Sequence, residues 1–287
     1  MLAITFGLLA SLCFAAASLL AQRGLHIYPT AWGAWFTLVL NGLFLFSSHL
    51  LLYTDAPIFV AENLPFVFVG LFVPGVTRVL TFRGIRTLGS AITSTIVNTT
   101  PVFSTLLAIL FLGERPGSMV LFAVILIVFG LVAISWDAGT RSWKKTELIY
   151  PGLAALLFAL KDVTVRWGLG GGAQPILAAG IAAVTSAVEI FFITRYIQGE
   201  KFSVPPLNAL HWFVTSGLFT GGSFLFMYLA LSMERVSIVG PMVNSYAVFV
   251  LILTPLIARR IEVITMRKAI GAVAVVAGVS LISLATQ

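Results

Sequence analysis

The sequence predicts an all-α integral membrane protein whose ten transmembrane helices form two inverted five-helix repeats. Three observations predict this fold. Hydrophobic residues make up 59% of the 287 residues and charged residues only 9%, whereas soluble domains hold about 25% charged residues. Apolar runs of the roughly 20 residues that a bilayer span needs follow one another with short connections. The two halves of the chain also align with each other.

The expected spans are the apolar runs, each of which ends at charged residues, proline or glycine. The first repeat, residues 1–136, is expected to hold helices at 2–22, 30–53, 63–85, 89–112 and 117–136. The second repeat, residues 148–287, is expected to hold helices at 148–168, 174–196, 207–232, 236–258 and 266–285. Residues 137–147 are the most polar stretch of the chain and the expected linker between the repeats.

Residues of the same type recur at matching places in the two halves. Phe14 aligns with Phe158, Asn98 with Asn244, Glu114 with Glu262 and Gly130 with Gly278. The offset between partners stays almost constant, so chance is a poor explanation. Each half has an odd number of spans, so the second half enters the membrane in the opposite sense to the first. Such inverted repeats place a substrate site near the midplane between the halves.

Composition and motifs exclude several classes of function. The net charge is +7, but the basic residues gather at helix ends, where membrane lipids are the expected partners and nucleic acid is not. The single cysteine, Cys13, excludes an intramolecular disulfide. No metal-ligand cluster, His-Glu-x-x-His motif or nucleophile elbow is present. We therefore expect no enzyme activity, no metal and no cofactor.

Charged residues inside the predicted spans are the first candidates for a site, because a charge at membrane depth is costly. Arg78 has the planar fork that suits a carboxylate or phosphate, although an internal ion pair or a snorkelling side chain would also explain it. Asp162 and Arg166 are spaced to pair along one helix face, which leaves Lys161 as a substrate or coupling candidate. Glu189 is either a coupling proton site or a structural partner of Arg195.

Polar and aromatic residues in the matching fourth and ninth spans are the second set of candidates. Ser94 and Asn98 lie in the fourth span, and Asn244 and Tyr246 lie in the ninth. Serine can satisfy its own helix carbonyls and asparagine can join two helices, but the symmetric placement favours lining of a cavity. The partners Phe14 and Phe158 are also expected to line it.

Two further pairs are expected to have structural roles. Glu114 and Glu262 precede the fifth and tenth spans and are expected to interact with the positive N-terminal ends of these helices. Gly130 and Gly278 lie on small-residue faces of the fifth and tenth spans, which indicates close helix packing rather than a ligand site.

The sequence resembles EamA-type ten-helix transporters of the drug/metabolite transporter superfamily. The resemblance rests on residues 84–103, on Leu112-Gly113-Glu114-Arg115, on Gly130 and on their echo from Ala230 to Gly278, where Ala258-Arg259-Arg260-Ile261-Glu262 replaces the Leu-Gly-Glu-Arg element. It implies a secondary-active carrier of a small polar metabolite that works by alternating access.

The buried basic residues favour an anionic or zwitterionic substrate, such as an amino acid, an organic acid or a phosphorylated compound. The alternative is a flippase for a lipid-linked anionic headgroup. We expect a monomer or homodimer in the bacterial inner (plasma) membrane, with a coupling proton or counter-substrate as a further partner.

Basic residues also predict the orientation, because they favour the cytoplasmic side. The linker side of the predicted topology holds twelve and the side of both termini holds three, namely Arg115, Arg166 and Arg235. The twelve are Arg23, Arg83, Arg86, Arg141, Lys144, Lys145, Arg195, Lys201, Arg259, Arg260, Arg267 and Lys268. The count predicts both termini outside the cell, whereas the resemblance implies that both lie in the cytoplasm.

We expect alkaline phosphatase to be active when fused to the C-terminus and inactive when fused within residues 137–147, because its disulfides form only outside the cytoplasm. Phosphatase activity of both fusions in whole cells checks this. The reverse pattern would show that the orientation implied by the resemblance is right and the charge count misleading.

Overall fold

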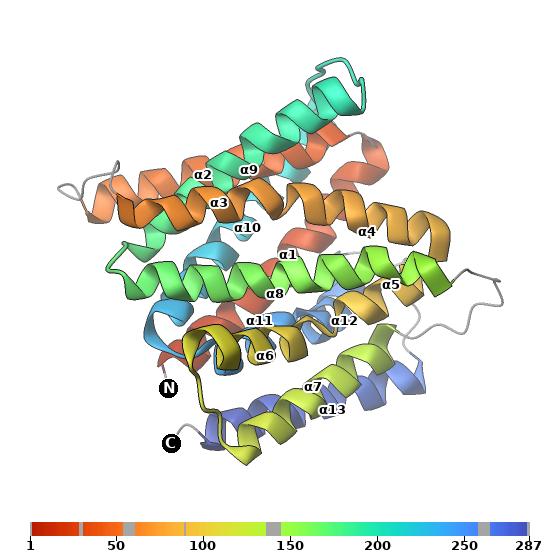
Figure 1. Ribbon diagram of the computed structural model, residues 1–287. Coiled ribbons are helices and arrows are strands. Elements are labelled where there is room, and N and C mark those ends of the chain that lie inside the picture. Colours follow the sequence, from red (N-terminus) through yellow and green to blue (C-terminus); the bar gives the residue numbers. More distant parts are fainter. Residues whose placement is uncertain are drawn as a thin grey trace.

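The computed structural model describes residues 2–28, 31–53, 61–88, 90–135, 145–257 and 265–285, and every regular element within them is helical (Figure 1). The α-helices are α1 (Leu2–Ile27), α2 (Ala31–Leu52), α3 (Leu64–Phe72), α4 (Gly75–Leu88), α5 (Ser90–Val97), α6 (Thr100–Leu112), α7 (Ser118–Ser135), α8 (Ile149–Gly170), α9 (Pro175–Phe192), α10 (Leu207–Met233), α11 (Val236–Asn244), α12 (Tyr246–Ile257) and α13 (Met266–Ala285). Single turns η1 (Ala61–Asn63), η2 (Lys145–Leu148) and η3 (Ile193–Ile197) flank three of them.

The described residues form ten spans that are long and apolar enough to cross a membrane, which confirms the predicted fold class. Seven spans are built on one continuous α-helix each. The third, fourth and ninth spans are interrupted and consist of α3 with α4, α5 with α6, and α11 with α12. Most of the predicted linker, residues 137–144, lies outside the described residues, as does Glu262.

Six of the spans form two bundles of three spans each, and the alignment of the two halves of the chain matches the spans of one bundle to those of the other. We call them the α8 bundle, made of α8 with α3–α4 and α5–α6, and the α1 bundle, made of α1 with α10 and α11–α12. Each bundle takes two spans from one half of the chain and one from the other, so the halves interlock. The remaining spans pack in symmetric pairs, α2 on α9 and α7 on α13.

Both chain termini lie at the same end of the molecule in Figure 1, together with the ends of α6, α8 and α10. We call this end the termini face. The starts of α5 and α8 lie at the opposite end, which we call the linker face. This arrangement follows from an odd number of spans in each half.

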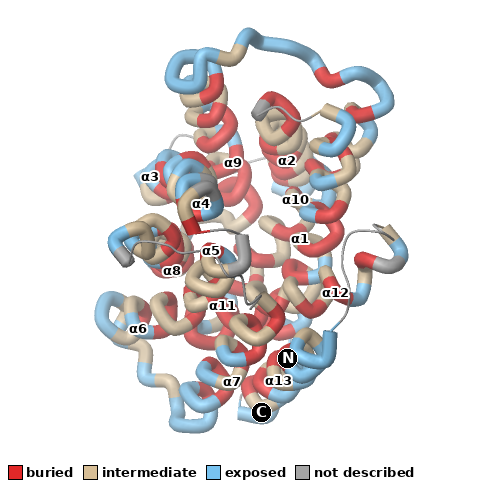
Figure 2. Tube along the Cα trace, turned by 90° about the vertical axis from the view of Figure 1, so that its right-hand side faces the viewer, coloured by how far each residue is buried: buried red, intermediate tan, exposed pale blue. Residues whose placement is uncertain are grey.

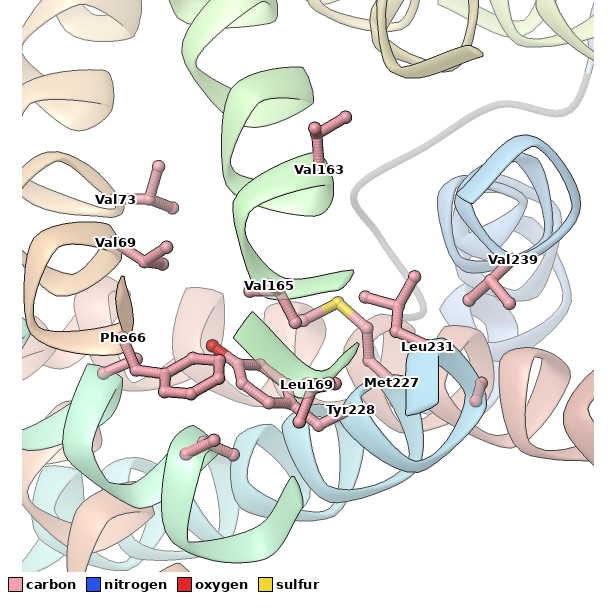
Figure 3. Close-up of a cluster of buried hydrophobic side chains, with 14 of the residues drawn as sticks. Phe66, Val69, Val73, Val163, Val165, Leu169, Met227, Tyr228, Leu231 and Val239 are labelled. Atoms are coloured by element: carbon pink, nitrogen blue, oxygen red, sulfur yellow. The ribbon is translucent and has the colours of Figure 1, made fainter. Parts of the chain in front are cut away.

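Apolar side chains fill the interior and also cover the outside. Figure 2 shows buried segments on the helix sides that face one another and exposed segments at the rim. Phe66, Met227 and Tyr228 belong to a core cluster that joins α3, α8, α10 and α11 (Figure 3). Leu51 and Leu110 are 83% and 74% exposed, as expected for helix surfaces that lipid covers.

Helices α7 and α13 approach so closely that only glycine fits at their contact. A methyl group on Gly130 would lie 2.5 Å from the carbonyl oxygen of Gly271. One on Gly278 would lie 2.9 Å from the carbonyl oxygen of Ala123. The predicted close packing at Gly130 and Gly278 is therefore confirmed, and the structure shows that the two faces pack on each other, as is typical of helix association in lipid.

We expect Gly130→Ala to lower stability by about 1–3 kcal/mol, because the new methyl group overpacks a backbone contact. The matched control is Gly152→Ala, since a methyl group there meets nothing within 4 Å and alanine is the better helix former by about 1 kcal/mol. Thermal unfolding of both variants in detergent measures the difference. Equal midpoints would contradict the close packing of α7 on α13.

Candidate functional site

The fourth and ninth spans are interrupted at equivalent residues. Between α5 and α6 the chain leaves the helix at Asn98 and Thr99, and between α11 and α12 it does so at Ser245, directly after Asn244. Asn98 and Asn244 are repeat partners, so the two interruptions lie at the same place in each half. Helix interruptions at corresponding positions of two repeats are typical of transporter substrate sites.

The two interrupted spans diverge beyond these residues. Helix α6 packs on α11, at the termini-face half of each span. The described residues of α5 and α12, in the linker-face halves, share no comparable packing. The bundles therefore meet at the termini face and separate toward the linker face.

A buried charged cluster lies where α6, α8, α10 and α11 meet. The Lys161 ammonium is 2.7 Å from Oδ1 of Asp162, and Ser104 Oγ donates to Oδ2 of Asp162 at 3.0 Å. Lys161 also contacts the sulfur of Met227 at 3.5 Å. A methyl group on Gly240 would lie 3.9 Å from Oδ2 of Asp162. Side chains of both bundles thus surround one ion pair.

The predicted pair between Asp162 and Arg166 is wrong, because Asp162 pairs with Lys161. Nη1 of Arg166 instead donates to the carbonyl oxygens of Leu231 and Ser232 at 2.8 and 3.0 Å. These are among the last carbonyl groups of α10, which have no partner within their helix and carry partial negative charge. Helical spacing alone could not reveal this acceptor, because it comes from a helix distant in sequence.

The two matching asparagines make different hydrogen bonds. Nδ2 of Asn98 donates to Oγ of Ser135 at 2.6 Å and to the Leu131 carbonyl oxygen at 3.4 Å, so it joins the fourth span to α7. Nδ2 of Asn244 donates to the Gly240 carbonyl oxygen of its own helix at 2.8 Å. For Asn98 the helix-joining alternative therefore describes the structure.

The aromatic candidates separate in the same way. Phe14 and Tyr246 lie edge to face with ring centroids 4.9 Å apart, so α1 and the ninth span bring them together. Phe158, the repeat partner of Phe14, packs against the buried core cluster instead. Ser94 is exposed on α5.

Ser104 is a member of the charged cluster that the helical spacing of Ser94 and Asn98 did not predict. The interruption at Asn98 and Thr99 changes the helical register between α5 and α6. A polar stripe extended from Ser94 with one helical period therefore fails to identify Ser104. Among the described residues, no group of three histidine, cysteine, aspartate or glutamate side chains could hold a metal ion.

Side chains of α9 contact the backbone on both sides of the interruption in the third span. Oγ of Ser186 donates to the carbonyl oxygens of Gly70 and Val73 at 3.1 and 2.8 Å, at the end of α3. One turn later, the Glu189 carboxylate lies against the backbone of Gly75 and Val76 at the start of α4, and its Oε2 is buried without a hydrogen-bond partner among the described residues. Glu189 therefore binds a helix N-terminus, an arrangement that neither hypothesis for it included.

The start of α4 is also where the chain carries Arg78, whose N–H donates to the Pro74 carbonyl oxygen at 2.8 Å. A methyl group on Gly75 would collide with the Glu189 carboxylate. Glycine at this position is thus what lets the carboxylate reach the backbone. Glu189 positions the half-helix that bears Arg78.

A cavity of about 830 Å³ opens at the termini face between the ends of α6 and α8 and the turn before α11. We call it the termini-face vestibule. Its charged lining residues are Glu62, Glu114, Arg115, Arg166 and Arg235. The three arginines are the same three that the sequence placed on the side of the termini.

Comparisons with known proteins agree with this geometry. The model of the EamA-like transporter family matches residues 1–136 and 147–284. A solved structure titled "Crystal structure of protein" is similar over 98% of each chain, with a TM-score of 0.81 and 17% sequence identity, which shows a shared fold. No curated protein matches the sequence.

We expect Glu189→Ala and Gly75→Ala each to destabilise the protein by about 1–3 kcal/mol, because each removes the carboxylate from the N-terminus of α4. The double variant should be little worse than either single one, since both changes break one contact. Thermal unfolding of the four proteins gives the coupling energy. Full additivity would show that Gly75 and Glu189 act independently.

Proposed function

Because the chain belongs to the EamA-like transporter family, and is therefore a membrane transporter of the drug/metabolite superfamily, we propose that it is a secondary-active carrier working by alternating access. Its substrate is a small anionic or zwitterionic metabolite, such as an amino acid, an organic acid or a phosphorylated compound. The observation that carries the proposal is the charged cluster between the two bundles, next to two interrupted helices.

The cluster favours this substrate class because its two charges, Lys161 and Asp162, pair with each other within the site. Asp162 pairs with Lys161 at a depth where an isolated ammonium would be costly. An incoming carboxylate or phosphate would share Lys161 with Asp162, and the ammonium of a zwitterion would bind Asp162. Arg78 would supply a second cation from α4, and the Phe14–Tyr246 pair an apolar wall.

The same cluster offers a means of coupling. Binding of a proton at Asp162 would free Lys161 for the substrate, and release of the proton would restore the ion pair. Arg166 and Glu189 are not assigned to this step, because Arg166 binds the end of α10 and Glu189 the start of α4. The bundles would then move against each other around the bound substrate.

The substrate class is tested by a thermal-shift screen, since a ligand that binds the folded state raises its midpoint. The panel holds amino acids, organic acids, sugar phosphates, quaternary amines and polyprenyl phosphates. Stabilisation by a soluble carboxylate or phosphate supports the carrier. Stabilisation by polyprenyl phosphate alone would identify a flippase, and stabilisation by amines alone would contradict the roles given to Arg78 and Lys161.

We expect Arg78→Gln to reduce uptake into proteoliposomes by about a hundredfold, because a charged hydrogen bond to the substrate is lost. Arg195→Gln is the matched control, since Arg195 is exposed and lies over the ring of Tyr196. Its uptake should equal that of the wild type. Normal uptake by the Arg78 variant would remove Arg78 from the site.

Lys161 needs a different design, because Lys161→Ala would leave a buried carboxylate without its partner. We expect Lys161→Met to lose uptake and stability together. Combining it with Asp162→Asn should restore the unfolding midpoint but not the uptake, since the ion pair is removed as a whole. Restored uptake in the double variant would mean that Lys161 has only a structural role.

A further inference from the structure

The turn between α10 and α11 is held by a carboxylate from another helix. Helix α10 ends at Met233 and α11 begins at Val236, so the turn is short. Oε1 of Glu114 accepts from Val236 N at 2.7 Å, and its Oε2 accepts from Ser237 N at 3.1 Å and Ser237 Oγ at 2.6 Å. The first N–H groups of a helix lack partners within it and attract an anion. Glu114 thus caps α11, not the fifth span as predicted.

A cation, Arg166, binds the helix end that precedes the same turn. Arg166 donates to the carbonyl oxygens of Leu231 and Ser232 near the end of α10. Each charge therefore matches the helix end that it binds: the anion lies at an N-terminus and the cation at a C-terminus. Nη1 of Arg235 adds a longer contact of 3.5 Å to the carbonyl oxygen of Arg115. We call these contacts the clasp.

Local backbone structure places Glu114 for this role. Helix α6 ends at Leu112 and is capped by Gly113, whose φ of 64° lies in the left-handed region that favours glycine. The N–H of Glu114 then bonds back to the Ala108 carbonyl oxygen at 3.2 Å. This reversal after α6 brings the carboxylate to the start of α11.

The clasp joins the two bundles to each other. Glu114 follows α6 and Arg166 lies on α8, both in the α8 bundle, whereas the turn that they hold belongs to the α1 bundle. The bundles can separate at the termini face only when these hydrogen bonds break. The vestibule beside the clasp holds Arg166 and Glu114 in its wall, so water can replace the broken bonds.

We propose that the clasp is the termini-face gate of the carrier, and that Glu114 and Arg166 are positioning residues that hold it shut. This inference rests on the proposed alternating-access function. In the state described here the gate is closed, and the vestibule is the outer part of a pathway that ends at the clasp. When the clasp opens, the vestibule becomes continuous with the Lys161–Asp162 cluster.

Access of a thiol reagent to a residue behind the clasp tests the proposal. Ala108 is fully buried and lies one helical turn from Ser104 on α6, between the cluster and the clasp. In a Cys13→Ala background, Ala108→Cys should react slowly with a charged maleimide. Adding Glu114→Gln or Arg166→Gln should raise the rate about tenfold, because each weakens charge-assisted hydrogen bonds. Glu114→Asp should restore part of the protection.

Glu62→Gln is the matched control, because Glu62 lines the same vestibule but is exposed and lies on η1. It should leave the rate unchanged. Unfolding midpoints of all variants identify any that are merely misfolded. Unchanged labelling of Ala108→Cys in folded Glu114→Gln and Arg166→Gln proteins would overturn the gate.

A second reporter separates failure of the gate from failure of the proposed function. Ser94→Cys lies on α5, in the linker-face half of the fourth span, where the wild-type side chain is exposed. Alternating access requires its labelling to fall as labelling of Ala108→Cys rises. If labelling of Ala108→Cys rises while labelling of Ser94→Cys does not fall, the clasp closes the termini face but the bundles do not alternate. That result would contradict the proposed function.

Discussion

Hydrocarbon cannot hydrogen-bond a free backbone group, and this constraint governs where the spans can be interrupted. Each break occurs where a neighbouring helix supplies polar side chains. Ser186 and Glu189 of α9 bind the two ends of the gap in the third span. Asn98 joins the gap in the fourth span to α7, and Ser245 in the ninth span bonds Ser11 of α1. Each break is therefore joined to a neighbouring helix by polar side chains.

The sequence predicts the spans and the repeat because both depend on local composition and on self-similarity. It also predicts close packing at the glycines of α7 and α13, since small residues at helical spacing have few other uses in lipid. It fails where the partner is a backbone group on a distant helix. Glu114, Arg166 and Glu189 all bind helix ends that periodicity cannot locate. Charge patterns favour side-chain partners for Arg166 and Glu189, and the order of the sequence favours the N-terminus of the fifth span for Glu114.

The same limit explains why the site was predicted only in part. Lys161 and Asp162 were identified because charges at membrane depth are costly, and this argument needs no knowledge of neighbours. Ser104 was missed because the break in the fourth span shifts the helical register. The symmetry of the repeat is a poor guide to these side chains. Asn98 joins the fourth span to α7, and Phe158 packs against the core cluster. Their repeat partners, Asn244 and Phe14, make different contacts on the ninth span and on α1.

The hydrogen bonds of Arg166 to the end of α10 make the termini face and the linker face of the molecule unequal. The alignment of the halves pairs Arg166 with Gln22, a neutral and exposed residue near the end of α1. Gln22 therefore supplies no cation that matches Arg166. Under the alternating-access mechanism proposed above, unequal contacts at the two faces would bias the empty carrier toward the state in which the termini face is closed. Substrate on the linker side would then meet a receptive molecule, whereas substrate on the termini side would wait for a rarer state.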